Sequence, residues 1–239
     1  MAGEVAYGLL PIENSLAGSV IPSYDVLGAN ELEVVGEVVW PIHHCLLAVA
    51  GARLEQIRRV ISHPVALAQC TRFFAEHPTL EAVSHYDTAG AAKTVAEGND
   101  LSVAAIAGRG AGELYGLQVL MYDIEDRPDN QTRFLAVRPV GRSEPPPRPA
   151  GEARYRTSLL AETPNTPGSL VRLLLPFSEA GVNLSKLESR PAAEPWSYRF
   201  FIDLDGEVGD APVRRALESA REVATVRILG SYPRWSRGG

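Results

Sequence analysis

The chain has 239 residues, 45% of them hydrophobic, and a formal net charge of −6, a balance typical of ordinary globular domains. Its arginines are scattered and form no basic run, so a nucleic-acid partner is not expected. The longest unbroken apolar run, 45–50, is too short to cross a membrane, and no signal peptide is visible. Two cysteines make no disulfide framework, so we expect a reduced, cytoplasmic protein without a membrane partner.

The first 140 residues alternate short apolar runs with helical patterns. Runs typical of strands lie at 6–12, 59–62, 80–84, 103–107 and 117–124. Helical patterns lie at 64–77, at 88–97 with Asp87 as the cap, and at 109–115. This alternation predicts an α/β sheet with helices on both faces.

A proline-rich stretch, 141–152, has no apolar periodicity and is expected to be an interdomain linker. It separates a first domain, 1–140, from a second, 153–235. In the second domain, strands are expected at 154–162, 182–189, 197–206 and 225–233, and helices at 166–181 and 211–223. The order is βαββαβ, the ferredoxin-like arrangement.

Two of these elements carry more detailed expectations. Thr166 is expected to cap the helix that begins at Pro167, and Pro176 to kink it. The strand 197–206 alternates apolar with mostly polar residues and is expected to bury one face only.

Three segments of the first domain place polar residues where a strand ends. They are Glu13, Asn14 and Ser15; Ser62, His63 and Gln69; and Asn130, Thr132 and Arg133. Ligands of open α/β sheets bind outside the carboxyl ends of strands, so these segments predict a site for a small anion.

Each segment also has a plainer interpretation, which the residues alone leave open. Asn14 and Ser15 are equally suited to cap a helix, and the segment at Ser62 is more often a helix cap than a ligand site. Thr132 and Arg133 would usually be a solvated pair. His43, His44 and Cys45 invite a metal site, but adjacent strand residues point to opposite faces, so none is expected. Cys70 is expected to be a packed core thiol.

Several quoted motifs together point to a family. In chain order, "PIENSLAGSV", "IHHCLL", "SHPVALAQC", "DTAGAA", "YGLQVL", "IED" and "NQTRFLAV" closely resemble the prephenate dehydratase domain. "TPNTPGSL", "GVNLSKLESRP" and "ILGSYP" resemble its C-terminal ACT regulatory domain. The resemblance implies a bilobed α/β dehydratase domain, similar to type II periplasmic binding proteins, followed by a ferredoxin-like ACT domain.

The same resemblance implies a reaction, the decarboxylative dehydration of prephenate to phenylpyruvate on the route to phenylalanine, with no cofactor and no metal. Thr132 would lie closest to the departing hydroxyl. Positioning and electrostatics would supply most of the acceleration, because a threonine is a poor general acid. The positions that match the family's catalytic residues are Thr132, Asn14, Ser62, Gln69 and Glu13, and those expected to bind substrate are Arg133, Ser15 and Phe134.

The ACT resemblance implies that L-phenylalanine binds as an effector at a subunit interface of a homodimer or homotetramer. The matching positions are Gly168, Ser169, Leu170 and Val171 in one motif and Glu188, Ser189, Arg190 and Pro191 in the other. The alternative is that these residues only shape a structural dimerisation module.

One departure from the family lies at the front. The family's dehydratase domain opens with a Gly-Pro-x-Gly segment several dozen residues before its Pro-Ile-Glu-Asn motif, whereas here Met1 falls within the strand that leads into it. We therefore expect this chain, taken alone, to be unstable or weakly active. Two alternative functions also stay open: an arogenate dehydratase, and a non-catalytic phenylalanine-binding regulator.

Overall fold

The computed structural model describes residues 5–141, 154–192 and 194–235. The chain divides into two compact units. Unit 1 comprises Met1–Asn14, Gly18–Trp40 and Thr132–Gly239, and unit 2 comprises Ser15–Ala17 and Pro41–Gln131. The proline-rich stretch expected to be a linker lies, apart from Gly141, outside the described residues. Within the described part, no helix is long and apolar enough to span a membrane.

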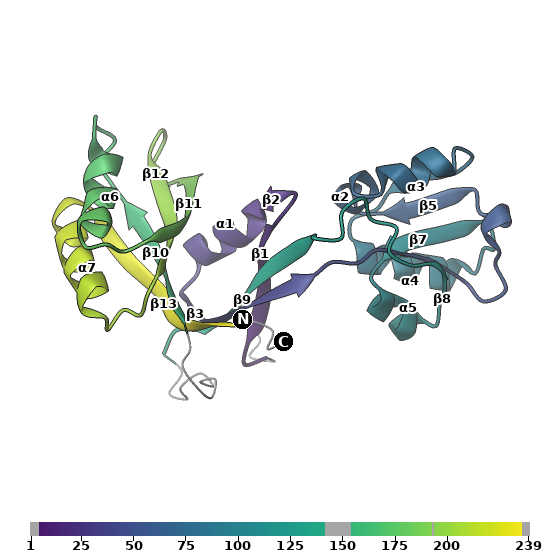
Figure 1. The fold of residues 1–239 in the computed structure, drawn as a ribbon, viewed down its shortest axis with the longest axis horizontal. Helices are drawn as coiled ribbons and strands as arrows, with labels where there is room; N and C mark the ends of the chain where they lie inside the picture. Colours follow the sequence, from purple (N-terminus) through teal and green to yellow (C-terminus); the bar gives the residue numbers. More distant parts are fainter. Residues whose placement is uncertain (1–4, 142–153, 193, 236–239) are drawn as a thin grey trace. The chain divides into compact units, whose positions relative to one another are not determined.

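Unit 2 is built on a five-stranded sheet in the order β6–β5–β7–β4–β8 (Figure 1). Its strands are β4 (Cys45–Ala48), β5 (Arg59–Ser62), β6 (Glu81–Ser84), β7 (Val103–Ala107) and β8 (Gln118–Met121). Its helices are η1 (Leu54–Gln56), α2 (Pro64–Ala68), α3 (Thr71–Glu76), α4 (Thr88–Gly98) and α5 (Arg109–Tyr115). β5 runs parallel to β6 and β7, whereas β4 is antiparallel to β7 and β8.

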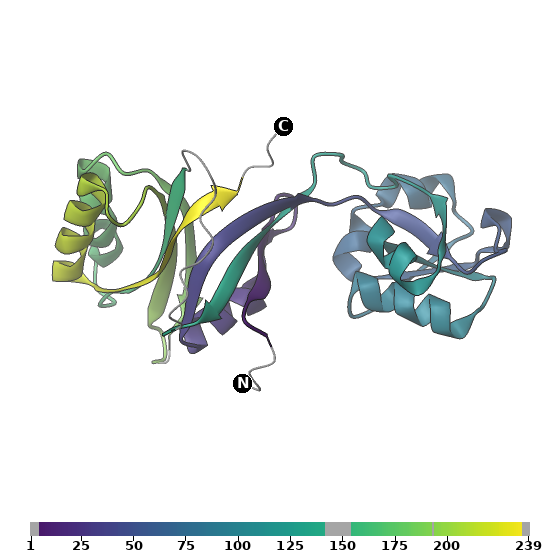
Figure 2. The same cartoon turned by 90° about the horizontal axis from the view of Figure 1, so that it is seen from below.

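Both faces of this sheet are covered, as the sequence predicted. The connections β5 to β6 and β6 to β7 cross the sheet in opposite directions, so right-handed crossovers put α2 and α3 on one face and α4 on the other. Figure 2 shows helices on either side of these strands. β4 and β7 lie in the sheet between these two layers of helices, and their residues, apart from Val103, are almost completely buried.

The helix expected over 64–77 is instead two helices, α2 and α3, which break at Gln69 and Cys70. The cause is distant in sequence. The Asp126 carboxylate accepts hydrogen bonds from the backbone N–H groups of Thr71 and Arg72, both at 2.9 Å. An acceptor at this point satisfies the open N–H groups of a new helix, so α3 begins at Thr71.

Unit 1 holds an eight-stranded sheet in the order β11–β12–β10–β13–β3–β9–β1–β2. Its strands are β1 (Gly8–Asn14), β2 (Gly18–Ser19), β3 (Leu32–Pro41), β9 (Gln131–Pro139), β10 (Tyr155–Glu162), β11 (Leu184–Pro191), β12 (Tyr198–Asp205) and β13 (Thr225–Trp235). Its helices are α1 (Ile21–Ala29), α6 (Ser169–Glu179) and α7 (Ala211–Val223). Strands from both halves of the sequence therefore share one sheet, joined where β13 pairs with β3.

Four of these strands and two helices form the expected ferredoxin-like module. β10, α6, β11, β12, α7 and β13 follow one another as βαββαβ, and the four strands pair antiparallel. α6 begins at Ser169, two residues later than predicted, because Gly168 has a φ of 80° and so lies outside helical geometry.

The half-buried strand predicted in this module is wrong in one respect, because β12 is buried on both faces. Ile202 and Leu204 pack against the core beneath α6 and α7, as the alternation predicted. Phe201 and Asp203, expected to face solvent, are also buried. The aromatic ring of Phe201 meets Tyr24 of α1 edge-on, with ring centroids 5.0 Å apart. The second face is covered by residues of the first 140, which no local pattern of β12 reveals.

Candidate active site

Two of the sequence motifs meet directly in unit 1. β1 and β9 pair antiparallel, which sets Asn14 opposite Thr132. The Asn14 Nδ2 amide donates a hydrogen bond to the Thr132 hydroxyl oxygen at 3.0 Å. The suggestion that Asn14 or Ser15 caps a helix is wrong, because α1 starts only at Ile21. Ser15 instead extends the pairing, since its hydroxyl oxygen accepts from the N–H of Gln131 at 3.0 Å.

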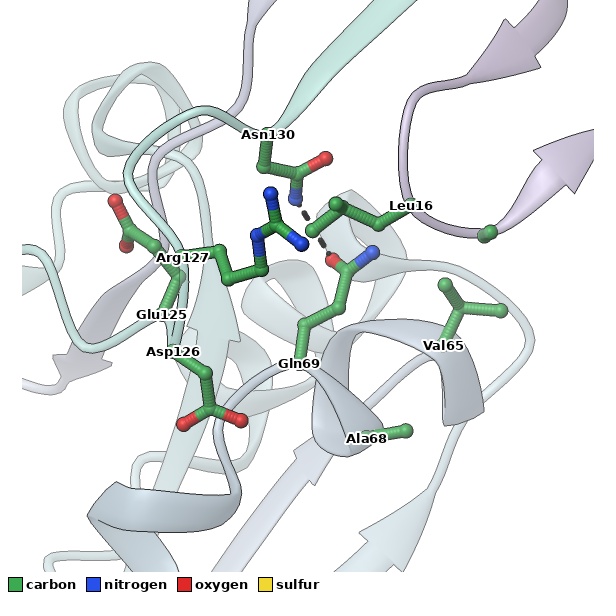
Figure 3. A pocket seen from close by; sticks show the side chains of 9 residues that line it. Leu16, Val65, Ala68, Gln69, Glu125, Asp126, Arg127 and Asn130 are labelled. Carbon is green, nitrogen blue, oxygen red and sulfur yellow. Dashed lines mark hydrogen bonds between the residues drawn. The ribbon is translucent and has the colours of Figure 1, made fainter.

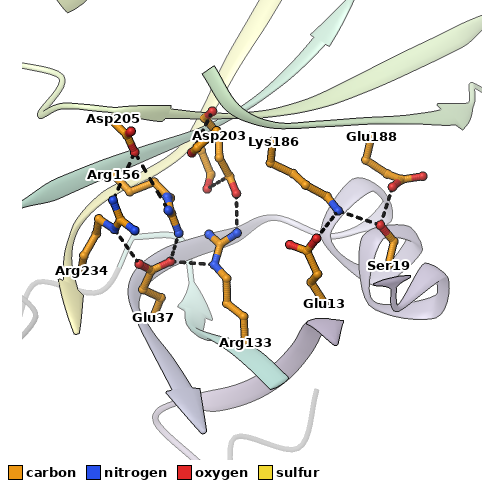
Figure 4. A network of polar contacts seen from close by, with 12 residues as sticks. Glu13, Ser19, Glu37, Arg133, Arg156, Lys186, Glu188, Asp203, Asp205 and Arg234 are labelled. Atoms are coloured by element: carbon orange, nitrogen blue, oxygen red, sulfur yellow. Dashed lines mark hydrogen bonds and ion pairs between the residues drawn. The ribbon is translucent and has the colours of Figure 1, made fainter. Parts of the chain in front are cut away.

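Arg133 lies on the opposite face of β9 from Thr132, because successive strand residues alternate. Its Nε donates to Glu37 and its Nη1 to Asp203, each at 2.6 Å, and its Nη2 donates to the Tyr232 hydroxyl at 3.1 Å (Figure 4). All three guanidinium nitrogens are thus engaged, and the side chain is only 10% exposed. These contacts favour a structural role, and the predicted binding of substrate by Arg133 stays a prediction. Phe134 is half-buried on the Thr132 face of β9, and its substrate role is likewise a prediction.

We call the group formed by Glu37, Arg133, Arg156, Asp203 and Tyr232 the charged cluster. Arg156 also donates to Glu37, and Ser158 bridges Asp203 and Tyr232. Burial alone would lower the pKa of Arg133, but Asp203, Tyr232 and Glu37 outweigh it and raise that pKa above its usual value. Burial likewise raises the pKa of the Tyr232 phenol. Cations and carboxylates neutralise one another where β3, β9, β10, β12 and β13 meet, although the buried Nε of Arg156 has no hydrogen-bond partner among the described residues.

The second predicted effector motif contacts the segment after β1. The burial of β11 alternates, so Lys186, Glu188 and Arg190 share one face. Lys186 Nζ binds the Glu13 carboxylate at 2.8 Å and the Ser19 hydroxyl at 2.9 Å (Figure 4). The Ser19 hydroxyl also donates to Glu188, and Arg190 pairs with Asp25 of α1 at 3.2 Å. Glu13, expected to be catalytic, is therefore occupied by Lys186, and its catalytic role stays a prediction.

The first predicted effector motif lies at the start of α6. Ser169 is buried and its hydroxyl is 2.7 Å from that of Thr166, whereas Val171 is exposed. Leu170 packs against the core of the module. The loop before α6 also reaches the β11–β12 hairpin, because Asn165 donates to the carbonyl of Trp196 at 3.0 Å.

Unit 2 contains a pocket of about 470 Å³. Apolar groups from the turn after β1 and from α2 form one side of it, and polar groups form the other (Figure 3). The lining residues are Leu16, Ala17, Val65, Ala68, Gln69, Glu125, Asp126, Arg127 and Asn130. Of the predicted site residues, Gln69 lies in this wall, and the break between α2 and α3 holds it there.

The charged groups of the pocket are largely occupied. Arg127 forms two hydrogen bonds with Asp129, at 2.9 and 2.6 Å. Burial alone would raise the pKa of Asp126, but hydrogen bonds from Thr71 and Arg72 outweigh it and lower that pKa. Glu125 accepts from the N–H of His44 at 2.8 Å and binds His43, and its pKa is also lowered against the effect of burial. The polar side of the pocket therefore offers chiefly the amide of Gln69, because its ions already have partners.

Ser62 is completely buried at the end of β5, and its hydroxyl donates to the Ile106 carbonyl at 2.6 Å. It does not cap α2. His63 does, because its Nδ1 accepts from the N–H of Val65. The catalytic role of Ser62 stays a prediction.

The two histidines considered for a metal lie between β3 and β4, not within a strand as expected, and they point to different partners. His43 Nδ1 lies 2.9 Å from Glu125 and 3.7 Å from Asp123, and the ligand atoms of these three residues lie within 4.8 Å of one another. In the described residues this is the group best arranged to hold a cation. His44 faces Gln69 instead.

Sequence reasoning missed three residues that organise the site. His44 was weighed only as a metal ligand, although its place beside a buried strand was a signal for a core hydrogen bond. Lys186 lies two positions before the second effector motif, within the quoted "GVNLSKLESRP", and no role was predicted for it. Asp203 lies at a position of β12 that the alternating pattern assigns to the solvent face. Nothing near it in the sequence indicates that it pairs with Arg133.

The fold and these groups define an α/β protein with a pocket in one unit and a ferredoxin-like module in the other. The family model described as prephenate dehydratase matches residues 1–141, and that of the ACT domain matches residues 157–222. The chain therefore belongs to the prephenate dehydratase family and includes an ACT domain.

Individual relatives agree with this assignment. The chain is 42% identical to a bifunctional chorismate mutase/prephenate dehydratase of Neisseria gonorrhoeae, over 96% of this chain and 62% of that one. It is 40% identical to arogenate dehydratase/prephenate dehydratase 2 of Arabidopsis thaliana, over 94% and 60%. The chain thus spans about 60% of the length of these curated relatives.

Two solved structures are similar along almost the whole chain. One is prephenate dehydratase of Arthrobacter aurescens in complex with L-Phe, with a TM-score of 0.86 and 36% identity over 98% of this chain and 76% of that one. The other, GqqA, is described as a quorum quenching acylase, with a TM-score of 0.86 and 35% identity over 98% and 84%. The bilobed α/β and ACT fold class expected from the sequence is confirmed.

Proposed function

We propose that this chain is a prephenate dehydratase that converts prephenate to phenylpyruvate, carbon dioxide and water in phenylalanine biosynthesis. The single observation that carries the proposal is the hydrogen bond from Asn14 to Thr132. It joins the two motifs that the family resemblance assigns to catalysis. Family membership and about 40% identity to dehydratases of this kind support the same activity.

The chemistry asked of Thr132 is modest. The bond from the ring to its carboxylate breaks and leaves its electron pair in the ring, and the bond to the 4-hydroxyl breaks as the ring becomes aromatic. The departing oxygen needs a proton or a strong hydrogen bond to leave as water. A hydroxyl has one donor and two acceptor lone pairs, and Asn14 occupies one lone pair of Thr132. The Thr132 proton is then directed elsewhere, and we assign it to the departing oxygen.

Substrate oxygens also need donors. Gln69 presents its amide in the pocket of unit 2 and is the group that we assign to them. Arg133 is left out of this role, because its three nitrogens already bind Glu37, Asp203 and Tyr232. Ser15 and Ser62 are kept as predictions from the resemblance.

For regulation, we propose that L-phenylalanine binds the ACT domain as an effector. The Arthrobacter aurescens relative was solved with L-Phe, and it covers 98% of this chain. The contacts from Lys186 to Glu13 and from Glu188 to Ser19 give the second effector motif a direct connection to the segment that carries Asn14. A homodimer or homotetramer in the cytoplasm remains part of the proposal, which the two free buried thiols suit.

Three other activities compete with this one. Arogenate dehydratase is a close variant, named for the Arabidopsis thaliana relative. A non-catalytic phenylalanine-binding regulator would keep the ACT contacts and lose the chemistry. An acylase is suggested by GqqA. A covalent acylase mechanism is not favoured, because Cys45 and Cys70 are buried with raised pKa values and the Ser62 hydroxyl donates to a carbonyl.

The test is phenylpyruvate release from prephenate by the 239-residue chain and by Thr132→Ala. We expect the substitution to lower kcat by about 10²- to 10³-fold, the cost of losing one donor aimed at developing charge. Thr132→Ser keeps the hydroxyl and should retain much of the rate. Thr79→Ala, on an exposed threonine of unit 2, is the matched control and should not change it.

Arogenate supplied to the same preparations separates the close variant, since the preferred substrate gives the larger kcat/KM. A rate that Thr132→Ala leaves unchanged would contradict the catalytic assignment. L-phenylalanine binding without conversion of either substrate would favour the regulator.

A further inference from the structure

The orientation of Gln69 in the pocket is set by two buried neighbours. Its side-chain oxygen Oε1 lies 2.9 Å from His44 Nε2 and 3.0 Å from Asn130 Nδ2 (Figure 3). His44 is 4% exposed and Asn130 is completely buried. An amide oxygen has two lone pairs, and these two contacts use both. The Gln69 amide nitrogen is therefore turned the other way, toward the Leu16 and Val65 side of the pocket (Figure 3).

The two neighbours are themselves fixed by the backbone. The N–H of His44 donates to Glu125 at 2.8 Å, and its carbonyl accepts from Ile124 at 3.0 Å. The carbonyl of Asn130 accepts from Ile42 at 2.8 Å. The carbonyl of Gln69 accepts from Asp126 at 2.7 Å, beside the break between α2 and α3. We call His44, Gln69 and Asn130 the amide cluster, and its geometry does not depend on exposed side chains.

The geometry also defines the protonation of His44. With Gln69 Oε1 as the acceptor, His44 must donate from Nε2, so the proton of the neutral ring lies on Nε2. Its Nδ1 is buried and has no hydrogen-bond partner among the described residues. A proton on Nδ1 would find no acceptor there. The reverse amide orientation of Gln69 would need the other tautomer and would direct the amide oxygen into the pocket.

We propose that His44 and Asn130 are positioning residues that hold the Gln69 amide N–H₂ as a donor to a substrate oxygen. This proposal rests on the proposed function, because that function assigns Gln69 to the substrate oxygens. An N–H₂ group selects a ligand that accepts, such as the carboxylate or keto oxygen of an anionic keto acid, and rejects one that only donates. Because the amide cluster already holds the Gln69 side chain in this orientation in the free protein, ligand binding costs no further conformational entropy of that side chain.

The first test reads the tautomer directly. In the wild-type chain labelled with ¹⁵N-histidine, we expect the His44 nitrogens to show the pattern of a neutral ring protonated on Nε2. The signals are assigned by their loss in His44→Gln. A ring that carries its proton on Nδ1 and not on Nε2 would overturn the proposal, because Nε2 would then accept and would face the Gln69 nitrogen. This readout does not depend on any activity of the chain.

The second test reads the effect on catalysis. His44→Leu removes the donor, and we expect kcat/KM for prephenate to fall by about 10²-fold, as when a reacting partner is misplaced by about 1 Å. His44→Gln offers a side-chain N–H₂ near the position of Nε2 and should recover most of that loss. His77→Leu is the control, because among the described residues the His77 ring contacts Phe73 of the neighbouring helix turn and no member of the amide cluster.

The outcomes separate the two proposals. An active wild type whose rate His44→Leu leaves unchanged would overturn the positioning role and leave the dehydratase assignment standing. A wild type that stays folded and yet converts no prephenate would count against the dehydratase assignment, and the tautomer would still decide the orientation of Gln69.

Discussion

The charged cluster of unit 1 and the amide cluster of unit 2 are both buried groups of polar side chains, and they are satisfied to different degrees. In the charged cluster, every nitrogen of Arg133 meets a carboxylate or phenol oxygen of the same unit. In the amide cluster, the hydrogen bonds of the Gln69 side chain to the described residues go to its oxygen, and its nitrogen lies in the pocket wall. Arg133 therefore has all of its nitrogens paired within its unit, whereas Gln69 keeps a donor in a pocket.

The difference teaches how to interpret polar residues at strand ends. Arg133 and Gln69 both belong to segments that follow strand ends in the sequence prediction, and the family resemblance assigned Gln69 to catalysis and Arg133 to substrate binding. Burial with complete pairing indicates a part that holds the fold, since leaving either partner alone is costly. A donor that lies in a pocket wall, as on Gln69, is available to a ligand. Thr132 belongs with Gln69, because Asn14 occupies only an acceptor position of its hydroxyl.

The largest effect expected is on stability. Arg133→Met leaves Glu37 and Asp203 as buried carboxylates that have lost their shared partner, and should lower the free energy of unfolding by about 3–5 kcal/mol. Arg109→Met breaks an exposed pair with Glu113 and should cost less than about 1 kcal/mol. Urea denaturation measures both. Equal losses in the two variants would contradict the structural role of the charged cluster.

The next effect concerns the link between the effector motif and the Asn14 segment. Lys186→Met removes the contacts to Glu13 and Ser19 and should weaken the response of the rate to L-phenylalanine. Coupling energies are typically about 1–3 kcal/mol, so the effector's influence should drop by about fivefold or more. Activity across a series of phenylalanine concentrations measures it. Lys93→Met, which breaks an exposed pair within α4, is the control. If Lys186→Met responds to L-phenylalanine as the wild type does, the Lys186 contacts do not couple the effector motif to the Asn14 segment.

A smaller effect, dependent on pH, is expected at Asp126. Asp126→Ala removes the acceptor for the first N–H groups of α3 and should cost about 0.5–2 kcal/mol, as for a helix cap. The pKa of Asp126 is lowered in the folded chain, so its contribution is present above the ordinary aspartate pKa and is lost as the pH falls through the lowered value.

The difference between wild type and Asp126→Ala in urea denaturation should therefore shrink on acidification over that window. Glu76→Ala, on an exposed residue of α3, should change stability by less than about 0.5 kcal/mol at any of these pH values. If the difference in the free energy of unfolding between wild type and Asp126→Ala grows as the pH falls, the proposed role of the ionised Asp126 carboxylate is contradicted.

The smallest effect is an absence of reaction in the folded chain. Burial raises the pKa of the Cys70 thiol to about 12 and also raises that of Cys45. Thiolates are the reactive form, so a disulfide reagent at mildly alkaline pH should label neither cysteine until urea unfolds the protein. Rapid labelling of the native chain would show that the core around β4 or α3 opens readily.

The predictions from sequence held where the information is local. The ferredoxin-like module followed from apolar periodicity, and α7 was predicted at its observed bounds. The cap predicted for α6 is wrong, because Gly168 and not Thr166 precedes its first residue. In unit 2, Asp87 caps α4 as expected by accepting from Gly90.

The errors lie where a distant residue decides. Asp126 divides the helix predicted over 64–77, and residues of α1 and β9 bury the second face of β12. The amide cluster joins residues from three separate segments, so no sequence window contains it. Family resemblance identified Gln69, and only the arrangement of His44 and Asn130 shows which end of its amide meets a ligand.

The most direct test of this account is kcat/KM for prephenate in Gln69→Leu, with the exposed Gln56→Leu as the matched control. The account predicts a loss of about 10²-fold or more in Gln69→Leu and none in the control, at similar urea midpoints. A Gln69→Leu chain that stays folded and releases phenylpyruvate at the wild-type rate would contradict it.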